Sequence, residues 1–165
     1  MVHSVYGIAN AFINKAAEHG QKLSHMQIQK LIYFANGYHL GATEKPMIDH
    51  TFEAWDYGPV IPNLYHQLKK FGGKPITGMC GTHDWDTNTF SPAPIPTGDQ
   101  RASRIIDFVW EKYGQYSALQ LSDMSHAPGS PWEKTKAQRP GIKDADIPDQ
   151  LIIEYFKKFV KKKVK

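Results

Sequence analysis

Apolar residues recur every three or four positions in several stretches of the chain, the spacing of one face of an α-helix. The first stretch begins after Ser4, which can cap a helix, and ends at Gly20. The second begins with Ser24 and Gln27, the reciprocal pair of a capping box, and is expected to end near Gly41. The short link between these two helices favours an antiparallel pair.

The same helical spacing returns at about Asp99, and the segment before it differs in amino-acid composition. The change begins at Pro46, and from Lys74 to Gly98 the chain is rich in Gly, Pro, Thr and Asp. In the segment that begins at Pro46, residues 51–55 (TFEAW) favour a strand, residues 57–59 (YGP) a turn, and residues 74–98 a long surface excursion that holds a hairpin. The further expected helices run from Pro62 to Phe71, from Asp99 to Gly114, from Ser117 to Met124, from Ser130 onward and from Asp146 onward.

These patterns predict a mainly α fold. We expect a compact single domain, residues 1–165, built as a bundle of about six helices with a short strand or hairpin insertion between residues 46 and 97. A chain of 165 residues is long enough to bury one core, and it shows no internal repeat and no clear linker.

Composition narrows the classes of protein. With 41% hydrophobic and 12% aromatic residues, the chain as a whole is not expected to be disordered. No apolar run approaches the roughly 20 residues that cross a bilayer, and the N-terminus lacks the pattern of a secretory signal. The single cysteine, Cys80, excludes an internal disulfide and a multi-thiolate metal site. We therefore expect a cytoplasmic protein with no membrane partner.

The net charge of +4 is concentrated at one end. Residues 157–165 hold six of the 20 basic residues, which leaves 14 basic against 16 acidic residues, or −2, in the rest of the chain. Such a basic tail is compatible with contact to nucleic acid or to an acidic partner. It is equally the composition of a solvated helix end, where lysines suit the helix dipole.

Three blocks of sequence are more distinctive than their surroundings. They are QKLIYFA at residues 29–35, FEAW at 52–55 with YGPVIP at 57–62, and the pairs Leu121-Ser122 and Pro131-Trp132 with His126 between them. In this order they resemble the Panacea domain of the SocA-like, phage-associated antitoxins. Residues 80–97 and the lysine tail carry no part of the resemblance.

This resemblance implies a small helical protein, encoded beside a toxin gene, that neutralises a cognate toxin by direct binding. In at least one branch of the family the antitoxin is an adaptor, which makes a cellular protease a second candidate partner. The toxins of the family are diverse, so the resemblance identifies neither the toxin nor its chemistry, and the oligomeric state stays open.

A partner-binding surface is expected around the second helix and the turn that follows it. Two interpretations stay open for its aromatic side chains, which can contact a partner or pack the turn against the helix. The predicted partner-binding residues are Lys30, Tyr33, Tyr38, Trp55, Tyr57, Pro59 and Tyr65. Gly58, His126, Pro131 and Trp132 are predicted to be structural.

The sequence offers little support for metal binding or catalysis. The cluster His83-Asp84-Trp85-Asp86 lacks the spacing of a known metal motif, and Cys80 lacks a motif that would make it a nucleophile. We therefore expect no enzyme, no metal and no cofactor. A DNA-binding regulator is the alternative function, since the tail offers phosphate contacts. The second helix, however, is aromatic rather than rich in the Arg or Asn that read bases.

Overall fold

The computed structural model describes the backbone of residues 1–163 and the side chains of residues 1–160. Within that part the chain forms seven α-helices, one 3₁₀ turn and two β-hairpins. The mainly α fold with a hairpin insertion is confirmed, with seven helices where about six were predicted. The helices are α1 (Val5–Glu18), α2 (His25–Thr43), α3 (Pro62–Leu68), α4 (Gln100–Tyr113), α5 (Ala118–Ser125), α6 (Pro131–Gln138) and α7 (Asp149–Lys163), and the 3₁₀ turn η1 (Lys69–Phe71) follows α3.

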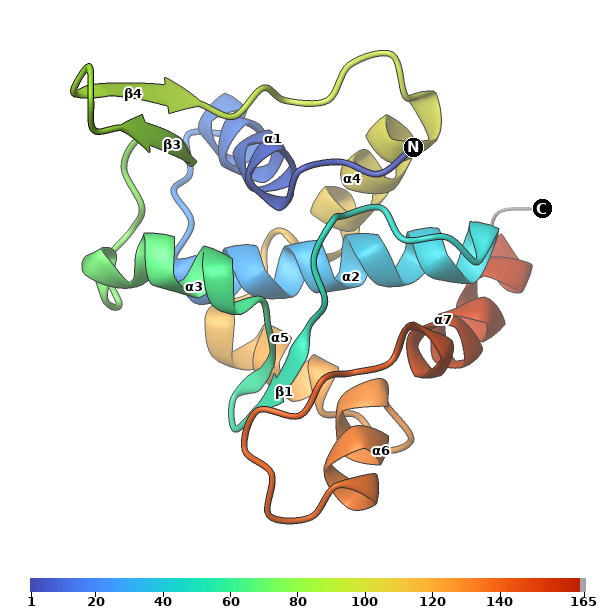
Figure 1. Cartoon of the computed structure of the whole chain (residues 1–165). Coiled ribbons are helices and arrows are strands. Elements are labelled where there is room, and N and C mark those ends of the chain that lie inside the picture. Colours follow the sequence, from blue (N-terminus) through green and yellow to red (C-terminus); the bar gives the residue numbers. More distant parts are fainter. Residues whose placement is uncertain (164–165) are drawn as a thin grey trace.

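Helix α2 lies at the centre of the molecule (Figure 1). Helices α1, α3, α4, α5 and α7 all pack against it, and every residue from Ile28 to Gly41 is buried. A helix that is enclosed on all sides presents no solvent face, so the usual division into an inner and an outer stripe does not hold for it. This arrangement decides the position of three predicted partner-binding residues, Lys30, Tyr33 and Tyr38.

The glycines of α2 allow another helix to approach closely. A side chain at Gly37 would overlap the ring of Phe156 on α7, and a Cβ atom at Gly41 would lie 2.8 Å from the backbone carbon of Phe156. Helix α2 therefore continues through Gly41 and ends at Thr43, with Glu44 in the left-handed conformation as its C-cap. The helix thus ends close to the expected position, but Gly41 does not stop it and instead makes room for α7.

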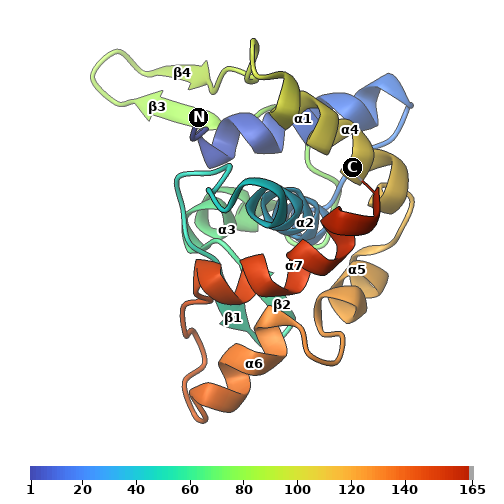
Figure 2. The ribbon, with the colours of Figure 1, turned by 90° about the vertical axis from the view of Figure 1, so that its right-hand side faces the viewer.

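The first two helices cross instead of lying antiparallel. In Figure 1 helix α2 runs across the view while α1 is seen nearly end-on, and in Figure 2 the two exchange these aspects. The predicted antiparallel pair is thus wrong. The predicted N-caps of both helices are confirmed. Ser4 accepts a hydrogen bond from the Tyr6 N–H, and Ser24 forms the full capping box with Gln27.

Two antiparallel hairpins interrupt the helices between α2 and α4. In the first, β1 (Glu53–Trp55) pairs with β2 (Gly58–Val60), and the backbone of residues 145–147 runs along the other edge of β1. In the second, β3 (Gly81–Asp84) pairs with β4 (Thr89–Pro92) and projects from the body above α1 and α3 (Figure 1). The first hairpin lies against α2, α5 and α6 and carries several predicted site residues.

Candidate partner-binding surface

The β1–β2 hairpin depends on one glycine. Gly58 begins β2 with a φ of +114°, a conformation that side-chain-bearing residues rarely adopt. A Cβ atom at this position would lie 2.6 Å from the Ser125 Oγ and 2.8 Å from the Lys30 Cε. Both the backbone conformation and the lack of space therefore require glycine, and the turn presents Asp56 and Tyr57 at its tip.

Four side chains from three helices hold the backbone of this hairpin. The amide of Gln29 donates to and accepts from the backbone of Ile61, at 3.0 and 2.9 Å. Three further donors reach carbonyl oxygens: the Lys30 Nζ that of Pro59 at 3.2 Å, the Ser122 Oγ that of Tyr57 at 2.5 Å, and the Trp132 Nε1 that of Trp55 at 2.6 Å. We call Gln29, Lys30, Ser122 and Trp132 the polar frame.

Burial dominates the electrostatics of the polar frame. The Lys30 side chain is fully buried, and among the described residues it has no ion pair with a carboxylate. This burial lowers the pKa of Lys30 to about 7. The ring of His126 stacks on that of Trp132, with centroids 3.9 Å apart, and burial followed by the charge of Lys30 lowers the pKa of His126. At neutral pH Lys30 is therefore partly neutral, and burial favours the neutral form of His126.

Above the polar frame, three of the predicted partner-binding residues meet on one surface groove. Tyr57 is 68% exposed, and Trp55 and Tyr65 are half-buried and pack edge to face with ring centroids 5.0 Å apart. The groove has a volume of about 400 Å³, and its other lining residues are Met26, Asp56, Val60, Lys143 and Asp144. We call this surface the Trp55 groove.

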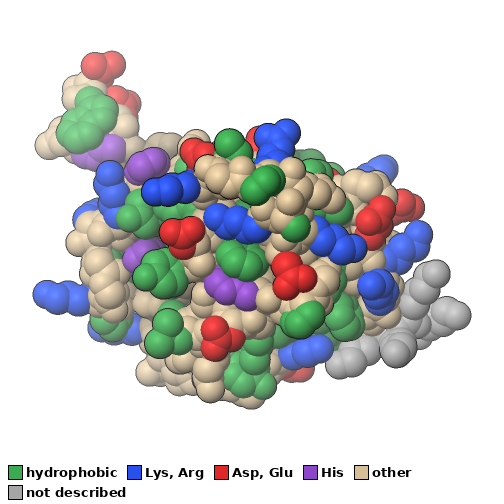
Figure 3. Space-filling model, turned by 90° about the horizontal axis from the view of Figure 1, so that it is seen from below, with side chains coloured by type: hydrophobic (Ala, Val, Ile, Leu, Met, Phe, Trp, Pro, Cys, Tyr) green, Lys and Arg blue, Asp and Glu red, His purple; other side chains and the backbone are tan. Residues whose placement is uncertain are grey.

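No sequence pattern indicated that Lys143 and Asp144 contribute to this groove. They come from the segment between α6 and α7, which reaches the hairpin because its residues 145–147 pair with β1. Seen from below, the face that holds α6 and its neighbours shows hydrophobic side chains among acidic and basic ones (Figure 3). Aromatic residues surrounded by charges are the composition of many protein-binding surfaces.

Comparison with known proteins identifies the family. The model of the family described as "Antitoxin SocA-like, Panacea domain" matches residues 28–133. This chain belongs to that family. It is also 35% identical over 126 residues to the curated antitoxin SocA of Caulobacter vibrioides (strain NA1000 / CB15N), an alignment that covers 76% of this chain and 66% of the relative. No solved structure matches the chain.

The Panacea match contains all four residues of the polar frame and both strands of the hairpin that they hold. Gly58, His126 and Pro131 also lie within it. Pro131 is the first residue of α6, and Ser130 before it accepts a hydrogen bond from the Glu133 N–H. The matched region therefore includes both the hairpin and the polar frame that holds it.

Four predicted partner-binding residues do not lie on the surface. Lys30 is buried beneath the hairpin, and Pro59 is a buried residue of β2 itself. Tyr33 is 2% exposed, and its ring packs edge to face against Phe52 and Phe156. Tyr38 is 5% exposed, and its hydroxyl lies 3.0 Å from that of Tyr113. Their prediction as partner-contacting residues is corrected by this burial: of the two interpretations left open, Tyr33 and Tyr38 follow the packing one, because α2 is enclosed and its Tyr33 side packs against α7 and the segment before β1.

The structure also shows the surroundings of the residues considered for catalysis and for metal binding. Cys80 is buried, burial raises the pKa of its thiol to about 11, and both its N–H and its carbonyl oxygen bond to the Asn10 side chain. Among the described residues no group of three or more His, Cys, Asp or Glu side chains is arranged to hold a metal ion. Within the same part of the chain, no helix is long and apolar enough to cross a membrane.

The predicted basic tail lies partly outside the described side chains. Lys157 and Lys158 belong to α7 and are exposed. The side chains of residues 161–165, which hold the other four lysines of the tail, lie outside the described residues.

Proposed function

We propose that this Panacea-domain chain is an antitoxin that neutralises a cognate toxin by binding it directly through the Trp55 groove. The observation that carries the proposal is an exposed aromatic side chain, Tyr57, on a hairpin whose backbone is fixed by the polar frame. An aromatic side chain on a rigid support loses little conformational entropy on binding, which is why such residues often dominate interfaces. The similarity to the curated antitoxin supports the class of partner.

The groove offers a binding surface of mixed character. Trp55 and Tyr65 form an apolar centre, and the charged side chains of Asp56, Lys143 and Asp144 surround it. Apolar centres contribute most of the affinity of an interface, whereas charges at the rim influence orientation and association rate. We therefore expect an apolar side chain of the toxin to occupy the centre of the groove.

The first experiment tests the complex itself. The purified chain is mixed with the product of the adjacent gene, and growth is measured when the two are co-expressed. A stable complex together with growth rescue is the expected result. If the two proteins form no complex and growth is not rescued, the antitoxin proposal fails, and binding to a DNA duplex of the promoter region becomes the next test.

A second experiment locates the surface. Tyr57→Ala should weaken toxin binding by roughly thirtyfold, the loss typical of one dominant interface residue. Leu119→Ala is the matched control, because Leu119 is 72% exposed but does not line the groove. Both variants should melt like the wild type. Equal affinity of the two variants would place the toxin on another surface.

The mode of neutralisation is a further part of the proposal. We propose that occupation of the toxin surface blocks it, and that the complex can also deliver the toxin to a cellular protease. Measuring the half-life of the toxin in cells with and without the antitoxin separates these routes. An unchanged half-life with full growth rescue would leave blocking as the only mechanism.

A further inference from the structure

The β3–β4 hairpin is a fixed arm, and its base is anchored by two amide side chains. Asn10, buried in α1, donates to the carbonyl oxygens of Cys80 and Ala93 at 2.8 Å and accepts from the Cys80 N–H at 2.6 Å. Gln67 of α3 donates to the Gly81 carbonyl and accepts from the Gly81 N–H, both at 2.9 Å. Beyond these anchors the arm extends away from the body (Figure 3).

Exposed aromatic side chains gather on this arm. Trp85 at its turn is 83% exposed and Phe90 on β4 is 50% exposed, and the ring of His83 lies 4.1 Å from that of Trp85 between centroids. Single exposed apolar side chains are ordinary, but several that gather on one surface often mark a site that another molecule covers. The fold gives them no packing role comparable to that of the buried rings around α2.

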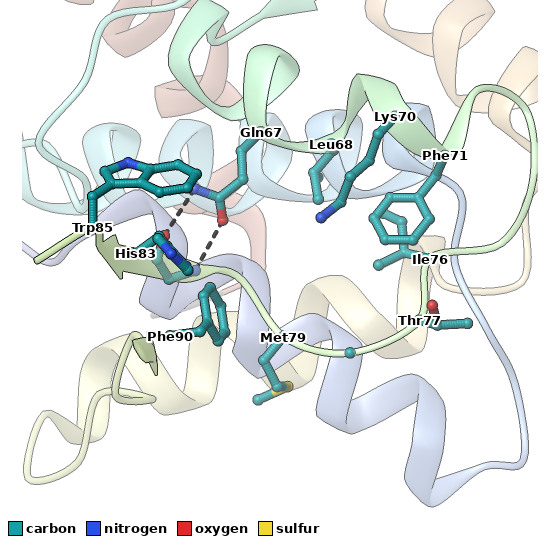
Figure 4. A pocket seen from close by; sticks show the side chains of 12 residues that line it. Gln67, Leu68, Lys70, Phe71, Ile76, Thr77, Met79, His83, Trp85 and Phe90 are labelled. Atoms are coloured by element: carbon teal, nitrogen blue, oxygen red, sulfur yellow. Dashed lines mark hydrogen bonds between the residues drawn. The ribbon is translucent and has the colours of Figure 1, made fainter. Parts of the chain in front are cut away.

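A groove of about 520 Å³ separates the arm from α3 and η1 (Figure 4). Most of the larger side chains around it are apolar or aromatic. They are Leu68, Phe71, Ile76, Met79, Trp85 and Phe90. Because the arm supplies one side and the helix the other, a bound segment would contact both at once.

One charge is directed at this groove. Among the described residues that line it, Lys70 is the only Lys, Arg, Asp or Glu. Its Nζ lies 5.4 Å from the centroid of the Phe71 ring, and in Figure 4 the amine points toward the middle of the groove. No carboxylate of the described residues forms an ion pair with it. The groove is therefore complementary to an apolar side chain that stands next to a carboxylate.

We propose that this groove binds a segment of the toxin that carries an apolar side chain next to an acidic one, and that the arm selects which toxin is bound. The inference rests on the proposed toxin binding. The polar frame lies in the sequence blocks that carry the Panacea resemblance, whereas the arm contains none of those blocks, although it lies within the matched residues 28–133. Helix α3 joins the two surfaces, since Tyr65 lines one groove and Leu68 the other.

The test compares charge reversals at two neighbouring lysines. Lys70→Glu should weaken binding to the purified toxin by at least about tenfold, because an acid would then face the acidic segment. Lys74→Glu makes the same change at an exposed residue that does not line the groove, and should alter affinity by less than about threefold. A double variant, Trp85→Ala with Phe90→Ala, should also weaken binding by at least about tenfold. Calorimetric titration measures all three, and thermal melts verify that each variant is folded.

The outcomes separate this proposal from the one on which it rests. If the wild-type chain binds the toxin and all the variants bind it equally well, the arm is not part of the interface and toxin binding through the Trp55 groove stands. If Lys70→Glu and Lys74→Glu weaken binding equally, the effect is general electrostatics and the groove is not the site. If the wild-type chain does not bind the toxin at all, the proposed function fails first.

Discussion

The amine of Lys30 lies 3.2 Å from the carbonyl oxygen of Pro59, buried among the core side chains beneath the β1–β2 hairpin. An ammonium group has three donors, and only this one hydrogen bond is available to it among the described residues. Burial therefore favours the neutral amine, and the hairpin is held by a group whose charge changes near neutral pH.

Stability should depend on pH through Lys30. Its pKa is about 7 in the folded protein against 10.5 when unperturbed, so between these values the unfolded chain binds one more proton. The free energy of unfolding should then rise with pH above about 7, by up to about 1.4 kcal/mol per pH unit. Lys30→Met, which keeps the apolar stem, should remove this slope. Guanidinium unfolding between about pH 7 and pH 9 measures it.

The measurement stops at about pH 9 because the Cys80 thiol contributes to the pH dependence above that value. Burial raises the pKa of Cys80 from 9.0 to about 11, so above about pH 9 the unfolded thiol ionises first, and this contribution offsets the rise in stability due to Lys30. The lowered pKa of His126 acts below its ordinary value of 6.5, outside the range on the acidic side. Equal slopes for the wild type and Lys30→Met would show that Lys30 stays protonated in the folded protein.

The buried hydroxyl of Tyr33 should cost stability. Among the described residues it has no hydrogen-bond partner, and the ring around it is enclosed by Phe34, Phe52 and Phe156. Tyr33→Phe should therefore raise the free energy of unfolding by about 1 kcal/mol, because an unpaired polar group leaves the core. Tyr33→Ala should lower it by about 3–5 kcal/mol through the cavity that it leaves. A loss of stability in Tyr33→Phe would reveal a partner for the hydroxyl.

Tyr33 is buried and Tyr57 is exposed, and the sequence pattern did not distinguish them. Helix boundaries follow from local signals, and the caps at Ser4, Ser24 and Ser117 are formed by the side chains that the sequence indicated. Exposure on α2 does not follow from them, because a helix enclosed on all sides has no outer face to assign. The spacing of Gly37 and Gly41 was the available signal, since two small residues one turn apart permit close helix packing.

The candidate site was predictable only in part, for a related reason. Trp55, Tyr57 and Tyr65 are close in sequence, so their common location on one groove is nearly local. Lys143 and Asp144 reach the same groove through pairing of residues 145–147 with β1, a contact between segments about 90 residues apart that no short motif encodes. The groove beside the β3–β4 arm likewise depends on contacts of the Asn10 and Gln67 side chains with residues far along the chain, which no local pattern indicates.

Gly58, the one glycine of the first hairpin, should not tolerate substitution. Gly58→Ala places a methyl group at a φ of +114° and against Ser125 and Lys30, so we expect a loss of roughly 2 kcal/mol or more. Gly129→Ala is the matched control: its φ is +78°, but no atom lies within 4 Å of the added carbon. The backbone conformation alone should cost this control about 1 kcal/mol. Urea unfolding compares them, and equal losses would mean that the close contacts relax without cost.

The last prediction concerns the Trp132 Nε1, which donates to the Trp55 carbonyl oxygen at 2.6 Å. Trp132→Phe removes this donor but keeps an aromatic ring against His126. We expect a stability loss of about 1 kcal/mol and faster amide hydrogen exchange in β1 and β2, because one of the bonds that fix the hairpin is gone. Toxin affinity should also fall, although Trp132 does not line the Trp55 groove.

A matched substitution elsewhere distinguishes local positioning from a general loss of stability. Trp110→Phe makes the same chemical change in the buried core on α4, where the side chain forms no hydrogen bond with the hairpin's backbone among the described residues. It should leave amide exchange in β1 and β2, measured relative to α1, unaltered. If Trp132→Phe also leaves that exchange and the affinity unaltered, the bond to Trp55 does not position the hairpin. If exchange rises while affinity is unchanged, the toxin does not require a rigid β1–β2 hairpin, and preorganisation of Tyr57 is not the source of binding.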